Sequence, residues 1–188
     1  MGIKDKVANS IFASVTPRTA GFNSIPVEKM TVGGIFLTIV LMFIGGSPGS
    51  TAGGMKTTTV VVLLYAMIST IRCREDVEIA KKRITKDIVY KAILVAIMSF
   101  LLVIIATFAL AITEKGFSLQ EILFEVVSAF GTVGLTLGIT TKLSILGKVI
   151  IAFCMYAGRV GPLTVILAFS NKSSKGKIKY PEEKILVG

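Results

Sequence analysis

Residues 92–112 read AILVAIMSFLLVIIATFALAI and contain no charged side chain. At about 1.5 Å per residue, a helix of this length spans the roughly 30 Å hydrocarbon core of a bilayer. The composition agrees, because 53% of the 188 residues are hydrophobic and 17% are charged, whereas a soluble domain averages about 25% charged residues. The sequence therefore predicts an all-α membrane protein.

Two further apolar segments precede this helix, at 30–44 and 57–71. Between them, residues 45–56 contain five glycines and a proline, a composition that cannot hold a regular helix. A last apolar segment, 143–168, is interrupted by Gly158-Arg159-Val160-Gly161-Pro162 and is expected to kink there. The spanning segments on both sides of residues 92–112 are thus predicted to be broken near their middle.

The charges predict orientation and exclude two classes of function. Residues 72–91 carry seven basic residues against four acids, and residues 171–188 carry five lysines against two glutamates. Both segments are therefore expected to be cytoplasmic. The orientation of these two segments accounts for most of the excess of basic residues behind the net charge of +10. Nucleic acid is therefore not an expected partner. The chain has no His and two distant Cys, so no metalloenzyme or His-dependent catalysis is expected.

Two parts of the chain match at one constant offset, which is typical of an internal repeat in a transporter or channel. In each copy a short amphipathic stretch (Asp5–Val15; Ser118–Phe130) leads into a glycine-containing loop and then into an apolar helix. Coincidence in a chain rich in Gly and Thr is the alternative. The matching pairs are Thr19 and Thr132, Gly21 and Gly134, Gly34 and Gly147, Gly45 and Gly158, and Thr51 and Thr164.

The two loops have the form of a potassium-channel selectivity filter, Thr-Val-Gly-Tyr-Gly. A short helix, a glycine loop and a spanning helix together predict a re-entrant pore loop, since irregular backbone at membrane depth must be packed in protein or line water. Glycine allows successive carbonyls to face one axis. Each loop lacks the second glycine, which leaves selectivity for potassium over sodium open. The predicted filter residues are Thr19, Ala20, Gly21, Phe22, Thr132, Val133, Gly134 and Leu135.

Charged residues flank both filter loops. Arg18 and Glu125 are predicted to support the loops by pairing or hydrogen bonding. Glu125 has an alternative role, in which its charge raises the local concentration of cations. Arg159 is the one charge deep in the last apolar segment, where an arginine costs at least about 2.5 kcal/mol, so it should face a pore or a polar partner.

The insert, residues 45–56, is predicted to act as a gate, because few packing contacts hold such a segment in one conformation. A helix break without motion is the alternative. A phosphate-binding loop is not expected, because Met55 separates Gly54 from Lys56. The predicted gating residues of the insert are Gly45, Gly46, Ser47, Pro48, Gly49, Ser50, Thr51, Gly53, Gly54 and Lys56.

Four segments, 14–23, 45–59, 128–134 and 158–164, closely resemble the Trk/Ktr/HKT superfamily of cation transporters, and most closely the membrane subunit of bacterial Ktr-type potassium uptake. The resemblance implies four covalently joined pore-loop repeats around one pore. This chain would hold about one and two-thirds of them and be the C-terminal portion of a longer transporter, with a genuinely short product as the alternative. It would comprise a partial third repeat (1–71), a cytoplasmic loop (72–91), the fourth repeat (92–170) and a cytoplasmic tail (171–188).

The resemblance also implies a function and partners. It implies regulated, passive uptake of potassium, alone or together with sodium, through the plasma membrane, without a cofactor. Arg159 would repel cations in the closed state and hydrogen-bond carbonyls near Gly45 to Ser50, or would simply anchor that loop. The implied partners are the lipid bilayer, the remaining repeats, a second copy in a homodimer and a cytoplasmic nucleotide-binding ring of the KtrA/TrkA type. A truncated, non-conducting scaffold subunit is the alternative function, and a membrane enzyme is a weaker one.

Overall fold

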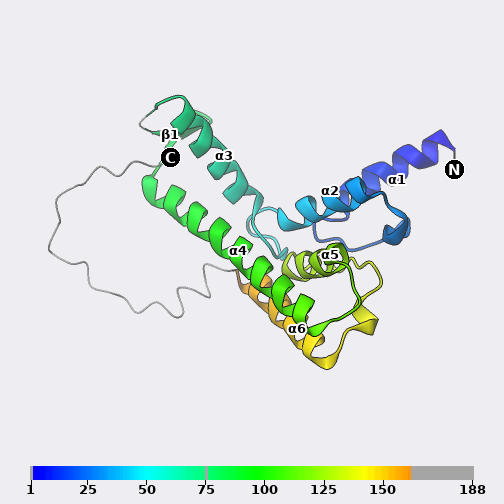
Figure 1. Ribbon diagram of the computed structural model, residues 1–188. Helices are drawn as coiled ribbons and strands as arrows, with labels where there is room; N and C mark the ends of the chain where they lie inside the picture. Colours follow the sequence, from blue (N-terminus) through cyan, green and yellow to red (C-terminus); the bar gives the residue numbers. More distant parts are fainter. Residues whose placement is uncertain (1, 75, 162–188) are drawn as a thin grey trace.

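The computed structural model describes residues 2–74 and 76–161. The expected tail, 171–188, lies outside the described residues, as do residues 162–170 of the fourth repeat, including Thr164. Within the described part, the chain is almost entirely helical (Figure 1). The helices are α1 (Ile3–Val15), α2 (Val32–Phe43), α3 (Thr57–Ile71), α4 (Lys86–Thr113), α5 (Leu119–Phe130) and α6 (Ile145–Val160), with 3-10 turns η1 (Val27–Lys29) and η2 (Thr140–Lys142).

Helix α4 contains the long apolar segment and extends it at its N-terminal end. It has 28 residues, a length of about 42 Å, and begins at Lys86 instead of Ala92 because the charged residues 86–91 continue the helix beyond the apolar stretch. Among the described residues, α4 is the helix long and apolar enough to cross a membrane alone. Helices α2 and α3 are apolar but shorter, with 12 and 15 residues.

The insert separates α2 from α3, as the glycines and Pro48 predict. Its two ends are tied together, because Gly45 N–H donates to Met55 O at 2.8 Å and Thr57 N–H donates to Gly46 O at 3.2 Å. These bonds satisfy backbone groups that the interrupted helix leaves without partners. The insert is therefore a closed loop with defined ends.

A β-hairpin joins α3 to α4, where the sequence alone predicts a loop over 72–91. Strand β1 (Val77–Ile79) pairs antiparallel with β2 (Lys82–Ile84). Ala80 and Lys81 form the turn with φ values of 51° and 62°, a conformation that Asn-Gly usually signals. The hairpin was missed because neither residue carries that signal. Arg83 also contacts Asp76 at 2.8 Å, and Ser69 Oγ of α3 donates to Asp76 O at 2.6 Å.

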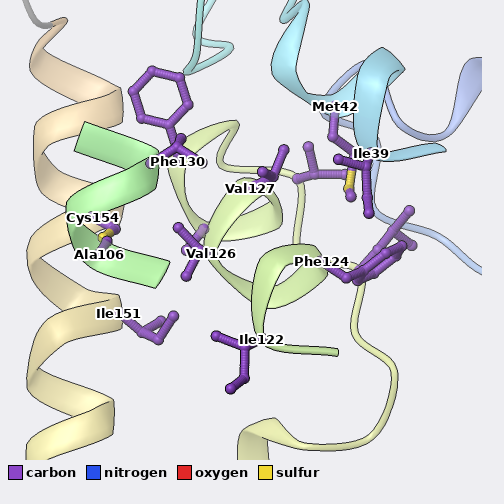
Figure 2. Close-up of a cluster of buried hydrophobic side chains, with 14 of the residues drawn as sticks. Ile39, Met42, Ala106, Ile122, Phe124, Val126, Val127, Phe130, Ile151 and Cys154 are labelled. Atoms are coloured by element: carbon purple, nitrogen blue, oxygen red, sulfur yellow. The ribbon is translucent and has the colours of Figure 1, made fainter. Parts of the chain in front are cut away.

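Helix α5 forms the centre of the hydrophobic core. It contacts α2 on one side and α4 and α6 on the other, and Phe124 and Phe130 are fully buried. Figure 2 shows side chains from all four helices converging on it. Helix α1, which should correspond to α5, has no buried residue and projects away from the other helices in Figure 1.

The segments that follow α1 and α5 have the same local geometry. Their equivalent residues are separated along the chain by the same interval that separates Thr19 from Thr132. Helices α2 and α6 begin at equivalent positions. Their N-caps, Thr31 and Ser144, accept hydrogen bonds from Gly34 N–H at 3.2 Å and Gly147 N–H at 3.1 Å, which is the usual role of a hydroxyl at this position. The turns η1 and η2 are related by the same offset. The two segments therefore fold alike in these details.

Candidate functional site

The two predicted filter loops adopt the same unusual backbone conformation. Thr19 and Thr132 have φ values of 70° and 53°, and Gly21 and Gly134 have φ values of 72° and 89°. Glycine adopts positive φ readily, but a β-branched residue does so rarely and at a cost of about 1–3 kcal/mol. The same strain at equivalent positions of both loops indicates a shared requirement for this backbone shape.

A hydroxyl group ties the far end of each loop back to its preceding helix. Thr16 Oγ1 donates to Phe22 O at 2.6 Å, and Ser128 Oγ donates to Leu135 O at 2.6 Å. In both loops the acceptor is the carbonyl directly after the glycine. The sequence reasoning missed these two hydroxyls, although each precedes the loop threonine by three or four residues.

From the strained threonine to the glycine of each loop, three consecutive carbonyl groups have no partner in the part of the chain that the structure describes. Within the described residues, the carbonyls of residues 19–21 and 132–134 accept no hydrogen bond. Backbone carbonyls normally have partners when they are withdrawn from water. These six oxygens are therefore the groups in the loops that can coordinate a ligand.

The fold brings the two loops side by side although they are far apart in the chain. A Cβ atom on Gly21 would lie 2.2 Å from Val133 O, so only glycine fits at this contact. Thr19 Oγ1 also donates to Gly131 O at 3.5 Å. The two loops are thus in direct contact with each other.

Glu125 lies buried behind the second loop, with 6% of its surface exposed. Its carboxylate accepts hydrogen bonds from Thr136 Oγ1 at 2.8 Å and from Thr140 Oγ1, one at each oxygen. A cavity of about 260 Å³ adjoins it and reaches Gly134. The carboxylate therefore connects α5 to the segment that follows the second loop, at Thr136 and Thr140. Arg18 lies elsewhere, at a cavity beside the first loop.

The insert touches the second filter loop directly. Gly53 N–H donates to Thr132 Oγ1 at 2.8 Å, and a Cβ atom on Gly53 would lie 2.6 Å from Thr132 Cγ2. Gly54 lies against Gly131. The insert thus lies at the threonine end of the loop, whereas the hydroxyl tie at Leu135 lies at the other end.

A second cavity, of about 450 Å³, separates the insert from the first loop. Polar and apolar atoms contribute about equally to its lining, and nearby Lys56 Nζ donates a hydrogen bond to Ala52 O. Within the insert, Ser50 Oγ donates to Ser47 O at 2.6 Å, and residues 47–51 are exposed. The lining residues are Arg18, Thr19, Gly46, Ser47, Ser50, Thr51, Ala52 and Thr57.

Helix α6 meets the same region at Gly158. A Cβ atom there would lie 1.9 Å from Phe130 O, and the same oxygen would lie 3.0 Å from a Cβ on Gly53. Arg159, the next residue, therefore begins close to the insert. It is exposed, and within the described residues it makes no ion pair and no hydrogen bond to the insert, so its role stays a prediction.

A second buried carboxylate, which the sequence reasoning missed, joins α4 to α6. Glu114 directly follows α4 and is 7% exposed. It accepts hydrogen bonds from the Ser144 amide at 3.1 and 3.2 Å and from the Ser144 hydroxyl, at the N-terminus of α6, where a negative charge is favourable. The contact fixes the end of α4 opposite the hairpin.

Comparisons with known proteins agree on one family. Residues 2–179 match the family model TrkH, described as "Cation transport protein". The chain is 45% identical over 186 residues to Ktr system potassium uptake protein B of Bacillus subtilis, covering 99% of this chain and 41% of that protein. It is 42% identical over 189 residues to Potassium/sodium uptake protein NtpJ of Enterococcus hirae, covering 98% and 42%. This chain thus spans about two-fifths of the length of these relatives.

A solved structure has the same fold. The crystal structure of the potassium transporter TrkH from Vibrio parahaemolyticus superposes with a TM-score of 0.78, at 19% identity, over 90% of this chain and 38% of that chain.

Proposed function

The chain belongs to the TrkH family of cation transport proteins, and from this premise we propose that it forms part of a membrane pore through which potassium ions pass. The observation that carries the proposal is the set of six carbonyl groups in the paired loops that accept no hydrogen bond from any described residue. Such carbonyls replace the water around a potassium ion. The relatives that share 42–45% identity are named for uptake of potassium, or of potassium and sodium.

In this pore the carbonyls of Thr19, Ala20 and Gly21, and of Thr132, Val133 and Gly134, coordinate the ion. The carbonyls of Phe22 and Leu135, also predicted as filter residues, accept hydroxyl hydrogen bonds and close each loop. The strained backbone and the hydroxyl ties support this division, because together they hold the intervening carbonyls in one conformation before an ion arrives.

A complete pore needs four loops, and this chain contributes two. The remaining repeats come from the rest of a longer transporter, as the relatives' length supports. The uncovered apolar residues of α1 then pack against those repeats or lipid. The hairpin segment and the tail face the cytoplasm, where a nucleotide-binding ring regulates the transporter, and two copies form the dimer. A non-conducting scaffold subunit is the alternative, and loss of transport after a filter substitution would argue against it.

The insert acts as the gate of this pore. It lies at the threonine end of the filter, against Thr132, and its residues 47–51 are exposed, so this part of the insert has room to move. Potassium crosses passively when the insert leaves the path, and no cofactor takes part.

Replacing Gly134 by aspartate in the native transporter should reduce potassium uptake at least about 100-fold. Gly134 has a φ of 89° and open space around it, so the side chain fits sterically but strains the backbone that aims the carbonyls. Gly116→Asp is the matched control, because Gly116 has a φ of 111° and open space outside the filter. Rubidium uptake by cells lacking other potassium transporters measures both variants. Uptake that Gly134→Asp leaves unchanged would refute the filter assignment.

Replacing Arg159 by alanine should raise potassium uptake measured without the activating regulator, by about fivefold or more, because a positive charge near the insert disfavours cations in the closed pore. Arg159→Lys keeps the charge but not the guanidinium geometry. If the charge is what matters, the lysine variant should behave like the native protein. If both variants raise uptake equally, Arg159 instead anchors the insert by hydrogen bonds. Unchanged uptake in both would contradict any gating role.

A further inference from the structure

The two filter threonines have the same backbone conformation but different side-chain partners. Thr132 Oγ1 accepts the Gly53 amide of the insert at 2.8 Å. Thr19 Oγ1 instead donates to Gly131 O at 3.5 Å and lines the 450 Å³ cavity that separates it from the insert. The insert is therefore bonded to one filter threonine and not to its counterpart.

The contact at Thr132 is close enough to admit only glycine on the insert side. A Cβ atom on Gly53 would lie 2.6 Å from Thr132 Cγ2, 2.8 Å from Thr132 Oγ1 and 3.0 Å from Phe130 O. On the filter side, the hydroxyl belongs to the same residue as the first of the three carbonyls that accept no hydrogen bond within the described residues. The same hydroxyl oxygen is thus within reach of the insert and next to the oxygens that are proposed to coordinate the ion.

We propose that the insert and the permeating cation compete for the Thr132 hydroxyl oxygen, so that closing the gate removes a ligand from the filter. The amide hydrogen carries a partial positive charge and the cation a full one, so the two repel each other when both approach the same oxygen. By linkage, an ion bound at this end of the filter weakens the insert's hold, and an insert in place weakens ion binding. The inference rests on the proposed function of the filter and the insert.

A double-mutant cycle in the native transporter tests the coupling. Gly53→Ala introduces the methyl group that collides with Thr132, and Thr132→Ser removes the Cγ2 atom that it meets first while keeping the hydroxyl. Rubidium uptake is measured without the activating regulator, together with the external potassium concentration that half-saturates uptake. Each value is normalised to the amount of protein in the membrane by immunoblot.

We expect Gly53→Ala to raise uptake without the regulator at least about fivefold and to lower the half-saturating potassium concentration. Adding Thr132→Ser should reverse part of both changes, because it removes the nearest of the three atoms that the methyl group meets, Thr132 Cγ2 at 2.6 Å. Thr19→Ser, the matched control, removes the equivalent methyl group from the loop that does not bond the insert and should reverse neither. Additive effects of Gly53→Ala and Thr132→Ser, or equal reversal by Thr19→Ser, would overturn the coupling.

Valine substitutions give an independent readout that introduces no larger side chain. Both Thr132→Val and Thr19→Val remove a filter hydroxyl and should raise the half-saturating potassium concentration. Only Thr132→Val should also raise uptake without the regulator, since it removes the acceptor of the Gly53 amide. The same resting uptake in the two variants would overturn the coupling. If the native transporter itself carried no rubidium, the proposed function would fail instead.

Discussion

Replacing Gly158 by alanine is expected to destabilise the transporter by about 2–3 kcal/mol or more and to abolish uptake. The new Cβ atom would lie 1.9 Å from Phe130 O, 2.8 Å from its carbonyl carbon and 3.1 Å from its Cα. All three are backbone atoms at the end of a buried helix, and they cannot rotate away. Overpacking typically costs about 1–3 kcal/mol even where side chains can adjust. The filter loop starts at this helix end, so α6 can relieve the clash only by disturbing it.

Thermal unfolding of the purified protein in detergent measures the stability effect. Gly33→Ala is the matched control, because Gly33 lies in α2 and a Cβ atom there would have no neighbour within 4 Å, and alanine is the better helix former by about 1 kcal/mol. The control should melt at or above the native temperature. A Gly158→Ala variant that melts with the native protein would show that α6 does not pack on α5 at this residue.

Replacing Glu125 by glutamine is expected to reduce maximal potassium uptake at least about tenfold. Each carboxylate oxygen accepts one threonine hydroxyl, whereas an amide offers a single accepting oxygen. Either Thr136 or Thr140 therefore loses its hydrogen bond to the charged carboxylate, and hydrogen bonds to charged groups are worth about 1.5–3 kcal/mol each. The segment that follows the second filter loop is then held less firmly. Gly134 lines the same cavity as Glu125, so we expect the loosening to reach the loop itself.

The form of the loss separates the two roles of Glu125. A support for the loop sets the maximal rate, so the deficit should persist at saturating potassium. A charge that concentrates cations acts through the apparent affinity, so saturating potassium would restore uptake. Glu78→Gln is the control: its contact with Arg74 is long, at 4.0 Å, and exposed, and such pairs contribute little. A native maximal rate for Glu125→Gln would contradict the support role.

The sequence predicts those parts of the fold that depend on local composition and on the spacing of hydrophobic residues. The break between α2 and α3 follows from five glycines and a proline in the insert, and the position of α5 follows from its amphipathic pattern. The constant offset between the two copies predicts equivalent turns at Thr19 and Thr132, and both threonines have positive φ. These features depend on local backbone preference, which a single sequence records.

Other features depend on contacts between distant residues, and the sequence does not reveal them. Nothing in the run after α4 shows that Glu114 will meet Ser144, 30 residues away. The hairpin turn is formed by Ala80 and Lys81 without its usual residues. Among the many hydroxyls of the chain, Thr16 and Ser128 are distinguished only by the carbonyls that they reach.

In the proposed pore, joining filter loops in one polypeptide has a consequence for how the pore can evolve. Thr19 and Thr132 share a backbone conformation and differ in their partners. In a pore built from identical subunits, every point mutation in the gene alters all the loops at once. In this chain a mutation at one codon changes one position around the axis and leaves its counterpart intact. Natural selection can therefore adjust ion preference in small steps, and one loop can acquire a task that its duplicate does not perform.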